Sequence, residues 1–204
     1  MLPEATPNEK TKISLWLKRG VNRVAVDYIK KNPDGNNHVY WAALGVMVMG
    51  EITDDQDMIK MSGKIYTTAL RNILPDGTLP KENARGQMAL SYNGWACAPL
   101  FLMSEVARKM GKNWYRREDG KLSLLADRFV EGLNNPDWFE KKIGIKQIVP
   151  SGRNLAWLAL YRRVSTSPEK VDAVLTKKPY YRSVMGGDLT MMAKMDYFSP
   201  NSNK

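Results

Sequence analysis

The stretch that decides the fold is NHVYWAALGVMVMGE, residues 37–51. As a helix it is apolar on nearly every side, which predicts that it is buried between neighbouring helices. Asp54 can cap the helix that follows, which carries apolar residues at helical spacing from Met58 to Ile73. Because the connection between these two helices is short, we expect them to pack antiparallel.

The same periodicity extends outward in both directions. An apolar stripe between Ile13 and Tyr28 predicts a helix that opens near Asn8 and closes at the Asn32-Pro33-Asp34-Gly35 turn. A long helix is expected at residues 87–110, where Pro99 could introduce a kink. Shorter helices are expected at residues 121–133, 136–142, 153–164 and 168–176.

No β-rich block is visible in the sequence. From Lys178 onward the chain is expected to be irregular, and a loose tail is expected from about residue 191. The sequence therefore predicts an all-α protein with a layered or toroidal array of antiparallel helices, forming a single domain over residues 1–204.

Composition limits the possible functions. The formal net charge of +10 predicts a surface that attracts polyanions such as nucleic acid, anionic lipid or an acidic polysaccharide. A single cysteine, Cys97, excludes an internal disulfide, and a single histidine argues against a His/Cys metal site. No segment has the length of a transmembrane helix or the apolar middle of a secretory signal.

Two short segments hold residues suited to chemistry. In NNHVYW, residues 36–41, the one histidine, His38, stands beside two amides and two aromatic rings where a loop enters the buried helix. In RGQMALSYN, residues 85–93, Arg85 and Tyr92 are seven positions apart, so on a helix both point the same way. Taken separately, each segment reads as structural: a capping asparagine before a core histidine, or a surface arginine and an interfacial tyrosine.

Taken together, the segments carry a family resemblance. Asn-Asn-His-x-Tyr-Trp, Asp-Gly-x-Leu-Pro at residues 76–80 and Arg-Gly-Gln-x-Ala-Leu-x-Tyr-Asn resemble the active-site helices of the alginate lyases of polysaccharide lyase family five. The separations match as well, with 47 positions from His38 to Arg85 and 7 from Arg85 to Tyr92. Weaker similarity at residues 156–161 and 186–190 extends the resemblance from about Leu15 to Thr190.

The resemblance implies an incomplete α/α toroid whose cleft binds a uronate chain in the periplasm. It also implies that this chain is shortened at its N-terminus, where relatives have the first helices of the toroid and a lid loop. The implied catalytic set is Asn37, His38, Arg85 and Tyr92, and Trp41 is implied to line the sugar site.

Some positions differ from the family pattern, and further sugar-binding residues are suggested by residue type alone. Many relatives have a basic residue where Met88 stands, and Tyr-His-Asn where this chain has Tyr92-Asn93-Gly94. By residue type, the aromatic rings of Trp41, Tyr40 and Trp95 could stack on sugar faces.

The residue types suit β-elimination of a 4-linked uronate. Cleavage removes the C5 proton and expels O4, and the ionised carboxylate on C5 resists the negative charge that develops. The amide of Asn37, the imidazole of His38 and the guanidinium of Arg85 can offset that charge. A phenol titrates at about 10 when unperturbed, and a cation such as Arg85 nearby would favour the phenolate of Tyr92.

Two assignments of the base remain open. In mannuronate the C5 proton and O4 lie on the same side of the ring, so Tyr92 could act as base and then as acid. Alternatively, His38 takes the proton and Tyr92 serves as the acid. Neither assignment requires a metal or an organic cofactor.

We therefore expect a monomer that binds alginate, and neither nucleic acid nor membrane, and that cleaves mannuronate-rich chains to 4,5-unsaturated uronate ends. Charge alone favours a nucleic-acid-binding protein, but no zinc finger, RNA-binding aromatic motif or dense basic helix is present. The sequence is also compatible with a non-catalytic relative that binds alginate or scaffolds its export, and with a lyase for another polyuronate such as glucuronan.

Overall fold

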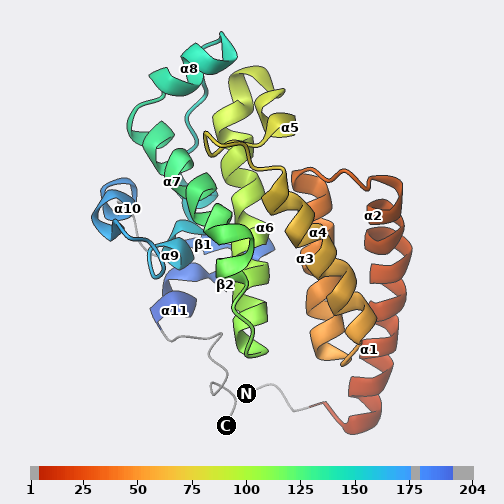
Figure 1. The fold of residues 1–204 in the computed structure, drawn as a ribbon. Coiled ribbons are helices and arrows are strands. Elements are labelled where there is room, and N and C mark those ends of the chain that lie inside the picture. Colours follow the sequence, from red (N-terminus) through yellow and green to blue (C-terminus); the bar gives the residue numbers. More distant parts are fainter. Residues whose placement is uncertain (1–4, 176–179, 195–204) are drawn as a thin grey trace.

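The computed structural model describes residues 5–175 and 180–194, and their secondary structure is almost entirely helical (Figure 1). The α-helices are α1 (Pro7–Val21), α2 (Asp27–Lys31), α3 (Asn37–Ile52), α4 (Gln56–Arg71), α5 (Pro80–Asn83), α6 (Ala89–Lys109), α7 (Lys121–Asn134), α8 (Asp137–Ile143), α9 (Leu158–Tyr161), α10 (Pro168–Val174) and α11 (Leu189–Lys194). A π-helical turn, Asn22–Val26, joins α1 to α2, and 3-10 turns cover Gly86–Met88, Trp114–Gly120, Gly152–Leu155 and Ser183–Met185. The strands β1 (Tyr181–Arg182) and β2 (Gly187–Asp188) form one short antiparallel pair. The all-α prediction is confirmed.

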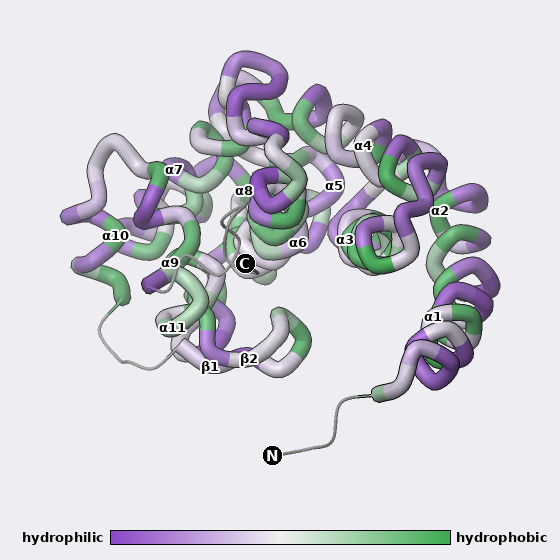
Figure 2. The backbone as a smooth tube through the Cα atoms, turned by 90° about the horizontal axis from the view of Figure 1, so that it is seen from below, coloured by the Kyte–Doolittle hydropathy of each residue, from purple (hydrophilic) through white to green (hydrophobic). Residues whose placement is uncertain are grey.

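Helix α3 lies at the centre of the array and packs against both α4 and α6. Its side chains are buried on several faces, with Val39, Ala43, Val46 and Met47 fully enclosed, as its nearly uniform apolar character predicts. Seen along the helices, the array follows an arc that is open between α1 and the β1–β2 pair, and α4 lies on the outer side of α3 (Figure 2). None of the described helices is both long enough and apolar enough to cross a membrane.

Side-chain caps set where the main helices begin. The Asn36 side chain accepts from the backbone N–H of Val39 at 3.2 Å and fixes the start of α3 at the predicted residue. The cap of α4 is Asp55, and the prediction of Asp54 is wrong by one residue: Asp54 adopts a φ of +51° just before the cap. The first helix begins at Pro7 through a capping box between Thr6 and Glu9.

Much of the apolar stripe of the first helix faces water in this structure, although Val21 and Ala25 pack against the core. Helix α1 contains no buried residue, and Trp16 and Val24 are 72% and 70% exposed. An ion pair between Lys18 and Asp55, at 2.6 Å, ties α1 to the start of α4. Periodicity therefore predicted the helix correctly, but it could not reveal that the part of the stripe from Ile13 to Leu17 stays exposed among the described residues.

The segment after residue 180 corrects the expectation of irregular chain. Tyr180 and Leu189 are buried, and the backbone N–H of Leu189 donates to the carbonyl of Tyr180 at 2.9 Å. Between these residues lies the β1–β2 pair, and α11 continues to Lys194, past the predicted start of the tail. Burial of scattered apolar residues, which shows no period in the sequence, orders this part of the chain.

Two expected helices before this segment differ from the prediction or extend beyond the described residues. The helix expected at residues 153–164 forms only as a 3-10 turn followed by α9. The helix expected at residues 168–176 is observed as α10, and its expected end at Thr176 lies outside the described residues.

The contact between α6 and α7 depends on a glycine. A Cβ on Gly94 would lie 2.2 Å from Cε2 of Phe129, whose ring is buried. We expect Gly94→Ala to lower the free energy of unfolding by about 1–3 kcal/mol through overpacking, as measured by urea denaturation. Gly45→Ala in α3 is the control, because a Cβ there meets nothing within 4 Å. Equal stability of the two variants would contradict this account of the contact.

Candidate active site

The predicted site residues lie at the start of α3, just after α5 and at the start of α6. Asn37 and His38 occupy the first turn of α3, Arg85 follows α5, and Tyr92 lies in the first turn of α6. Side-chain hydrogen bonds join α5 to α3 and to α6, so these three segments hold one another in position.

One hydrogen-bond network fixes the loop before α5 onto α6. Asp76 accepts from the backbone N–H and the hydroxyl of Thr78, at 3.1 and 2.7 Å. The Asn83 amide donates to the Thr78 hydroxyl at 2.8 Å, and the Asn93 amide donates to Asn83 at 3.1 Å. Asn93 also accepts from the backbone N–H of Leu79 at 2.9 Å. The asparagine beside Tyr92 therefore has a structural role in this chain.

The glycine of the Asp-Gly-x-Leu-Pro motif is required by its surroundings. Gly77 has a φ of +81°, and a Cβ at this position would lie 2.7 Å from the carbonyl oxygen of Leu124. Lys142 forms an ion pair with the neighbouring Asp76. The motif thus holds the loop against α7 and α8 and positions the segment that carries Arg85.

A buried carboxylate connects α3 to Arg85. Glu82 is fully buried and accepts from both the backbone N–H and the side-chain amide of Asn37, each at 2.8 Å. Nε of Arg85 lies 3.7 Å from the same carboxylate. Sequence reasoning missed Glu82, although its place three residues before Arg85 is the spacing of a helical ion pair.

Asn37 is enclosed by this arrangement. Its side chain is 0% exposed, its amide N–H is committed to Glu82, and its Oδ1 has no hydrogen-bond partner in the described structure. In this structure the amide of Asn37 faces Glu82, and its expected action on a substrate carboxylate stays a prediction. Here it acts on the site by holding Glu82.

Arg85 and Tyr92 lie in contact, closer than the two helical turns that their spacing predicts. Cζ of Arg85 lies 4.8 Å from the centre of the Tyr92 ring, and the Arg85 side chain is 36% exposed. The guanidinium therefore lies over the face of the ring, a cation–π contact that leaves donors free for an anion. Because a 3-10 turn separates Arg85 from α6, the contact does not arise from a single continuous helix.

His38 is exposed in the first turn of α3. In the part of the chain that the structure describes, no hydrogen bond or ion pair joins it to Arg85 or Tyr92. It is connected to them through its neighbour Asn37, which contacts Glu82 and hence Arg85. Its imidazole is open to solvent at the same end of the helix array.

The three predicted sugar-binding aromatics have different positions. The rings of Trp41 and Trp95 lie 4.9 Å apart at an angle of 41°, and both are half-buried. Tyr40 is only 2% exposed, and its burial, together with the charge of Glu82, raises the pKa of its phenol. A ring enclosed in the core cannot stack on a sugar, so the prediction for Tyr40 is wrong.

A cavity of about 500 Å³ opens beside Tyr92 and is lined in part by Ser91, Trp95, Ser151, Asn154 and Arg182. Cζ of Arg182 lies 4.3 Å from the centre of the Trp95 ring, and its Nη1 donates to the side chain of Asn154. Burial and the nearby charge of Arg153 lower the pKa of Arg182. Sequence reasoning missed Arg182, because it lies in a segment without helical periodicity.

The site therefore offers two guanidinium groups, from Arg85 and Arg182, near the phenol of Tyr92 and beside the Trp41–Trp95 pair. Guanidinium groups bind carboxylates well, since their planar donors match the two oxygens. Such a surface fits a chain of acidic sugars. The family model described as alginate lyase matches residues 1–139 of the 204.

The chain belongs to the alginate lyase family.

Several curated proteins are similar to this chain. A polysaccharide lyase of Stenotrophomonas maltophilia (strain K279a) is 34% identical over 93% of this chain and 57% of its own length. An alginate lyase of Pseudomonas syringae pv. syringae (strain B728a) is 33% identical over 87% of this chain and 48% of its own length. The chain thus spans about half the length of the curated relatives that it matches.

The fold matches that of a solved member of the alginate lyase family. The crystal structure of alginate lyase A1-III from Sphingomonas species A1 superposes with a TM-score of 0.81 at 24% identity, covering 94% of this chain and 56% of that one. The predicted incomplete α/α toroid is confirmed, and the open arc of Figure 2 is the part of it that this chain forms.

Proposed function

We propose that this chain provides the catalytic groups of a polysaccharide lyase that cleaves mannuronate-rich alginate by β-elimination. The observation that carries the proposal is the contact between Arg85 and Tyr92. A guanidinium lies over the ring of a phenol, and Tyr92 lines a cavity that is also lined by a second guanidinium, Arg182.

In the proposed reaction, Arg85 binds the carboxylate on C5 of the sugar whose bond is cut, and the exposed His38 contributes a further donor. Tyr92 removes the C5 proton, the C4–C5 double bond forms, and the electron pair leaves with O4, which takes up a proton. Arg182 and the Trp41–Trp95 pair hold a neighbouring sugar. Donors that are already positioned where negative charge develops lower the barrier without reorganisation.

Two solved structures of alginate lyase A1-III support a role in turnover for His38 and Tyr92. Variants of alginate lyase A1-III with one histidine changed to alanine, and with one tyrosine changed to phenylalanine, are each described as complexed with tetrasaccharide. By the positions in the names of these structures, the two replaced residues stand 54 apart, as do His38 and Tyr92 in this chain. The match favours assigning both residues to substrate turnover.

The test is to incubate the chain with polymannuronate, polyguluronate and polyglucuronate and to follow the ultraviolet absorbance of the unsaturated uronate. We expect absorbance to rise fastest with polymannuronate. A faster rise with polyglucuronate would assign the site to another polyuronate. Affinity for polymannuronate without any rise would identify a non-catalytic binding protein.

A further inference from the structure

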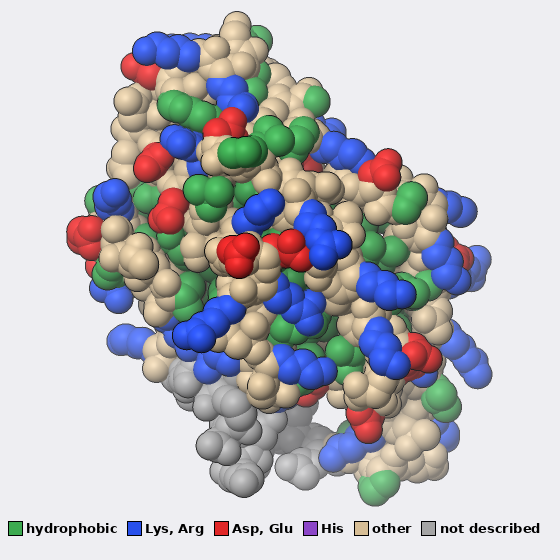
Figure 3. All heavy atoms as spheres, viewed as in Figure 1, with side chains coloured by type: hydrophobic (Ala, Val, Ile, Leu, Met, Phe, Trp, Pro, Cys, Tyr) green, Lys and Arg blue, Asp and Glu red, His purple; other side chains and the backbone are tan. Residues whose placement is uncertain are grey.

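A second basic surface lies on the side of the arc away from the candidate active site. A groove of about 1000 Å³ runs between α4 and the 3-10 turn Trp114–Gly120. We call it the α4 groove, and the residues used below are Lys60, Lys64, Arg71, Lys112, Trp114 and Arg117. Helix α4 is on the outer side of α3 in Figure 2. The sequence has one histidine, His38 of the candidate active site, and no histidine is in view on the face of the molecule that Figure 3 shows.

Positive charge dominates the groove. Five of its lining residues are lysine or arginine, whereas Asp57 is the one acidic residue among the described residues that line it. The contact of Asp57 with Lys60, at 3.7 Å, is between two highly exposed side chains and is weak. Arg71 pairs with Glu118 at 3.1 Å. Lys64 and Lys112 are exposed, and within the described ranges neither forms an ion pair.

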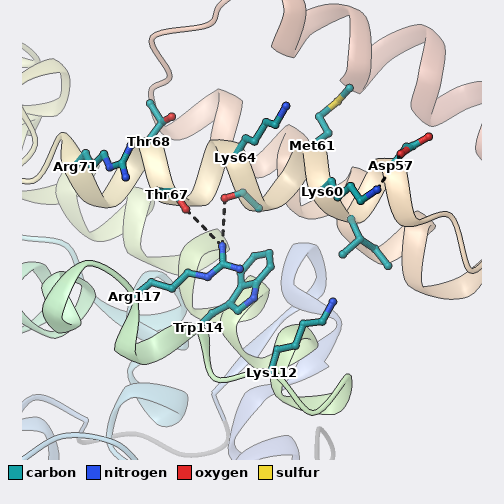
Figure 4. A pocket seen from close by; sticks show the side chains of 12 residues that line it. Asp57, Lys60, Met61, Lys64, Thr67, Thr68, Arg71, Lys112, Trp114 and Arg117 are labelled. Carbon is teal, nitrogen blue, oxygen red and sulfur yellow. Dashed lines mark hydrogen bonds and ion pairs between the residues drawn. The ribbon is translucent and has the colours of Figure 1, made fainter.

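Arg117 is held rigidly at the base of the groove (Figure 4). Its Cζ lies 4.0 Å from the centre of the Trp114 ring, and its Nη1 donates to the carbonyl of Gly63 at 3.3 Å and to the hydroxyl of Thr67 at 3.4 Å. An arginine fixed in this way loses little conformational entropy when it binds an anion. Lys112 extends from the opposite wall towards α4 in the same view.

The cations form a row. Lys60, Lys64 and Arg71 stand at i, i+4 and i+11 on α4, which spreads them over roughly 16 Å along one side of the helix. A row of this length suits an extended chain that carries a charge on each unit better than it suits a single small anion. Thr67 and Thr68, which also line the groove, add hydroxyl groups between the cations.

A polyuronate fits this surface better than a nucleic acid does. Single-stranded nucleic acids are usually held by bases that stack on exposed aromatic rings. Trp114 is the only aromatic side chain among the described residues that line the groove, and it is 3% exposed beneath Arg117. Carboxylates and hydroxyls, the groups of a uronate chain, are the partners that lysine, arginine and threonine can bind.

We propose that the α4 groove is a second, non-catalytic binding site for the anionic polysaccharide, which holds a distant part of the same polymer while another part occupies the candidate active site. This inference rests on the proposed function for its ligand. Two sites on one long chain increase its overall affinity, because binding at one raises the effective concentration at the other. A short oligosaccharide cannot reach both.

The test compares two double variants with equal loss of charge. Lys64→Gln with Lys112→Gln alters the groove, and Lys10→Gln with Lys12→Gln alters exposed lysines of α1 as the control. Affinity for long polymannuronate is measured by calorimetry at low salt, with Tyr92→Phe added to every protein so that the polymer stays intact. We expect the groove variant to bind roughly fivefold to tenfold more weakly and the control to be close to the parent, while the affinity for a trisaccharide is the same in all.

Equal affinity of the two double variants for the long polymer would overturn the proposal. A groove variant that loses affinity for a single-stranded oligonucleotide but keeps it for polymannuronate would also overturn it, in favour of a nucleic-acid site. Because the readout is binding, its result is independent of turnover. A chain that fails to cleave alginate but shows the expected difference would contradict the proposed function and leave this inference standing.

Discussion

Tyr92→Phe is expected to lower the rate of polymannuronate cleavage by at least about 100-fold, the scale of a lost general acid–base group. The substitution removes one hydroxyl and keeps the ring on which the Arg85 guanidinium lies, 4.8 Å from its centre. Binding of the polymer and the stability of the fold should therefore change little. The initial rate is read from the ultraviolet absorbance of the unsaturated product, and affinity is measured separately by calorimetry.

The control for this prediction is Tyr28→Phe. Tyr28 lies in α2 and is 37% exposed, so removal of its hydroxyl should leave turnover unchanged. If Tyr92→Phe cleaved at the rate of the control, Tyr92 could be neither base nor acid. If it lost binding together with turnover, the hydroxyl would belong to substrate recognition, and the assignment of proton transfer would fail as well.

Glu82→Ala is expected to lower the free energy of unfolding by about 3 kcal/mol or more, since removing one partner of a buried polar cluster leaves the others unpaired. Two N–H groups of Asn37 lose their acceptor, and Arg85 loses the carboxylate at 3.7 Å. Cleavage should fall too, because the position of Arg85 depends on this contact. Urea denaturation gives the first quantity and the absorbance assay gives the second.

Two further variants make the result specific. Glu82→Gln keeps the shape and one acceptor, so its loss of stability should be smaller than that of the alanine variant. Glu131→Ala removes a glutamate that is 53% exposed in its ion pair with Arg128 and should cost no more than about 0.5 kcal/mol. An unfolding midpoint of Glu82→Ala as high as that of Glu131→Ala would show that the buried cluster is not what holds α5 against α3.

The long helices were predictable because their signals are local. The apolar run at residues 37–51 and the cap at Asn36 determine α3, whose observed bounds are Asn37–Ile52. The chain after residue 180 carries no period, and its order comes from burying Tyr180 and Leu189 against distant helices. Such contacts depend on the whole fold and leave no mark on the neighbouring sequence.

The site was predictable in part for a similar reason. The spacing of Arg85 and Tyr92 indicated that they point the same way along one helix, whereas the structure places Arg85 before α6 and its guanidinium over the Tyr92 ring. Which aromatic ring of the Tyr40-Trp41 pair faces the interior could not be read from two adjacent residues of similar character. The answer depends on how α3 packs against distant segments, and Glu82, 45 positions beyond Asn37, is one residue that contacts its start.

The starts of α3 and α6 at this site have one more consequence. Each helix carries a partial positive charge at its first turn, because the backbone dipoles align along the axis. This charge belongs to the backbone and does not depend on any one side chain. A portion of the electrostatic attraction for an acidic sugar should therefore persist when a charged or polar side chain of the site is replaced.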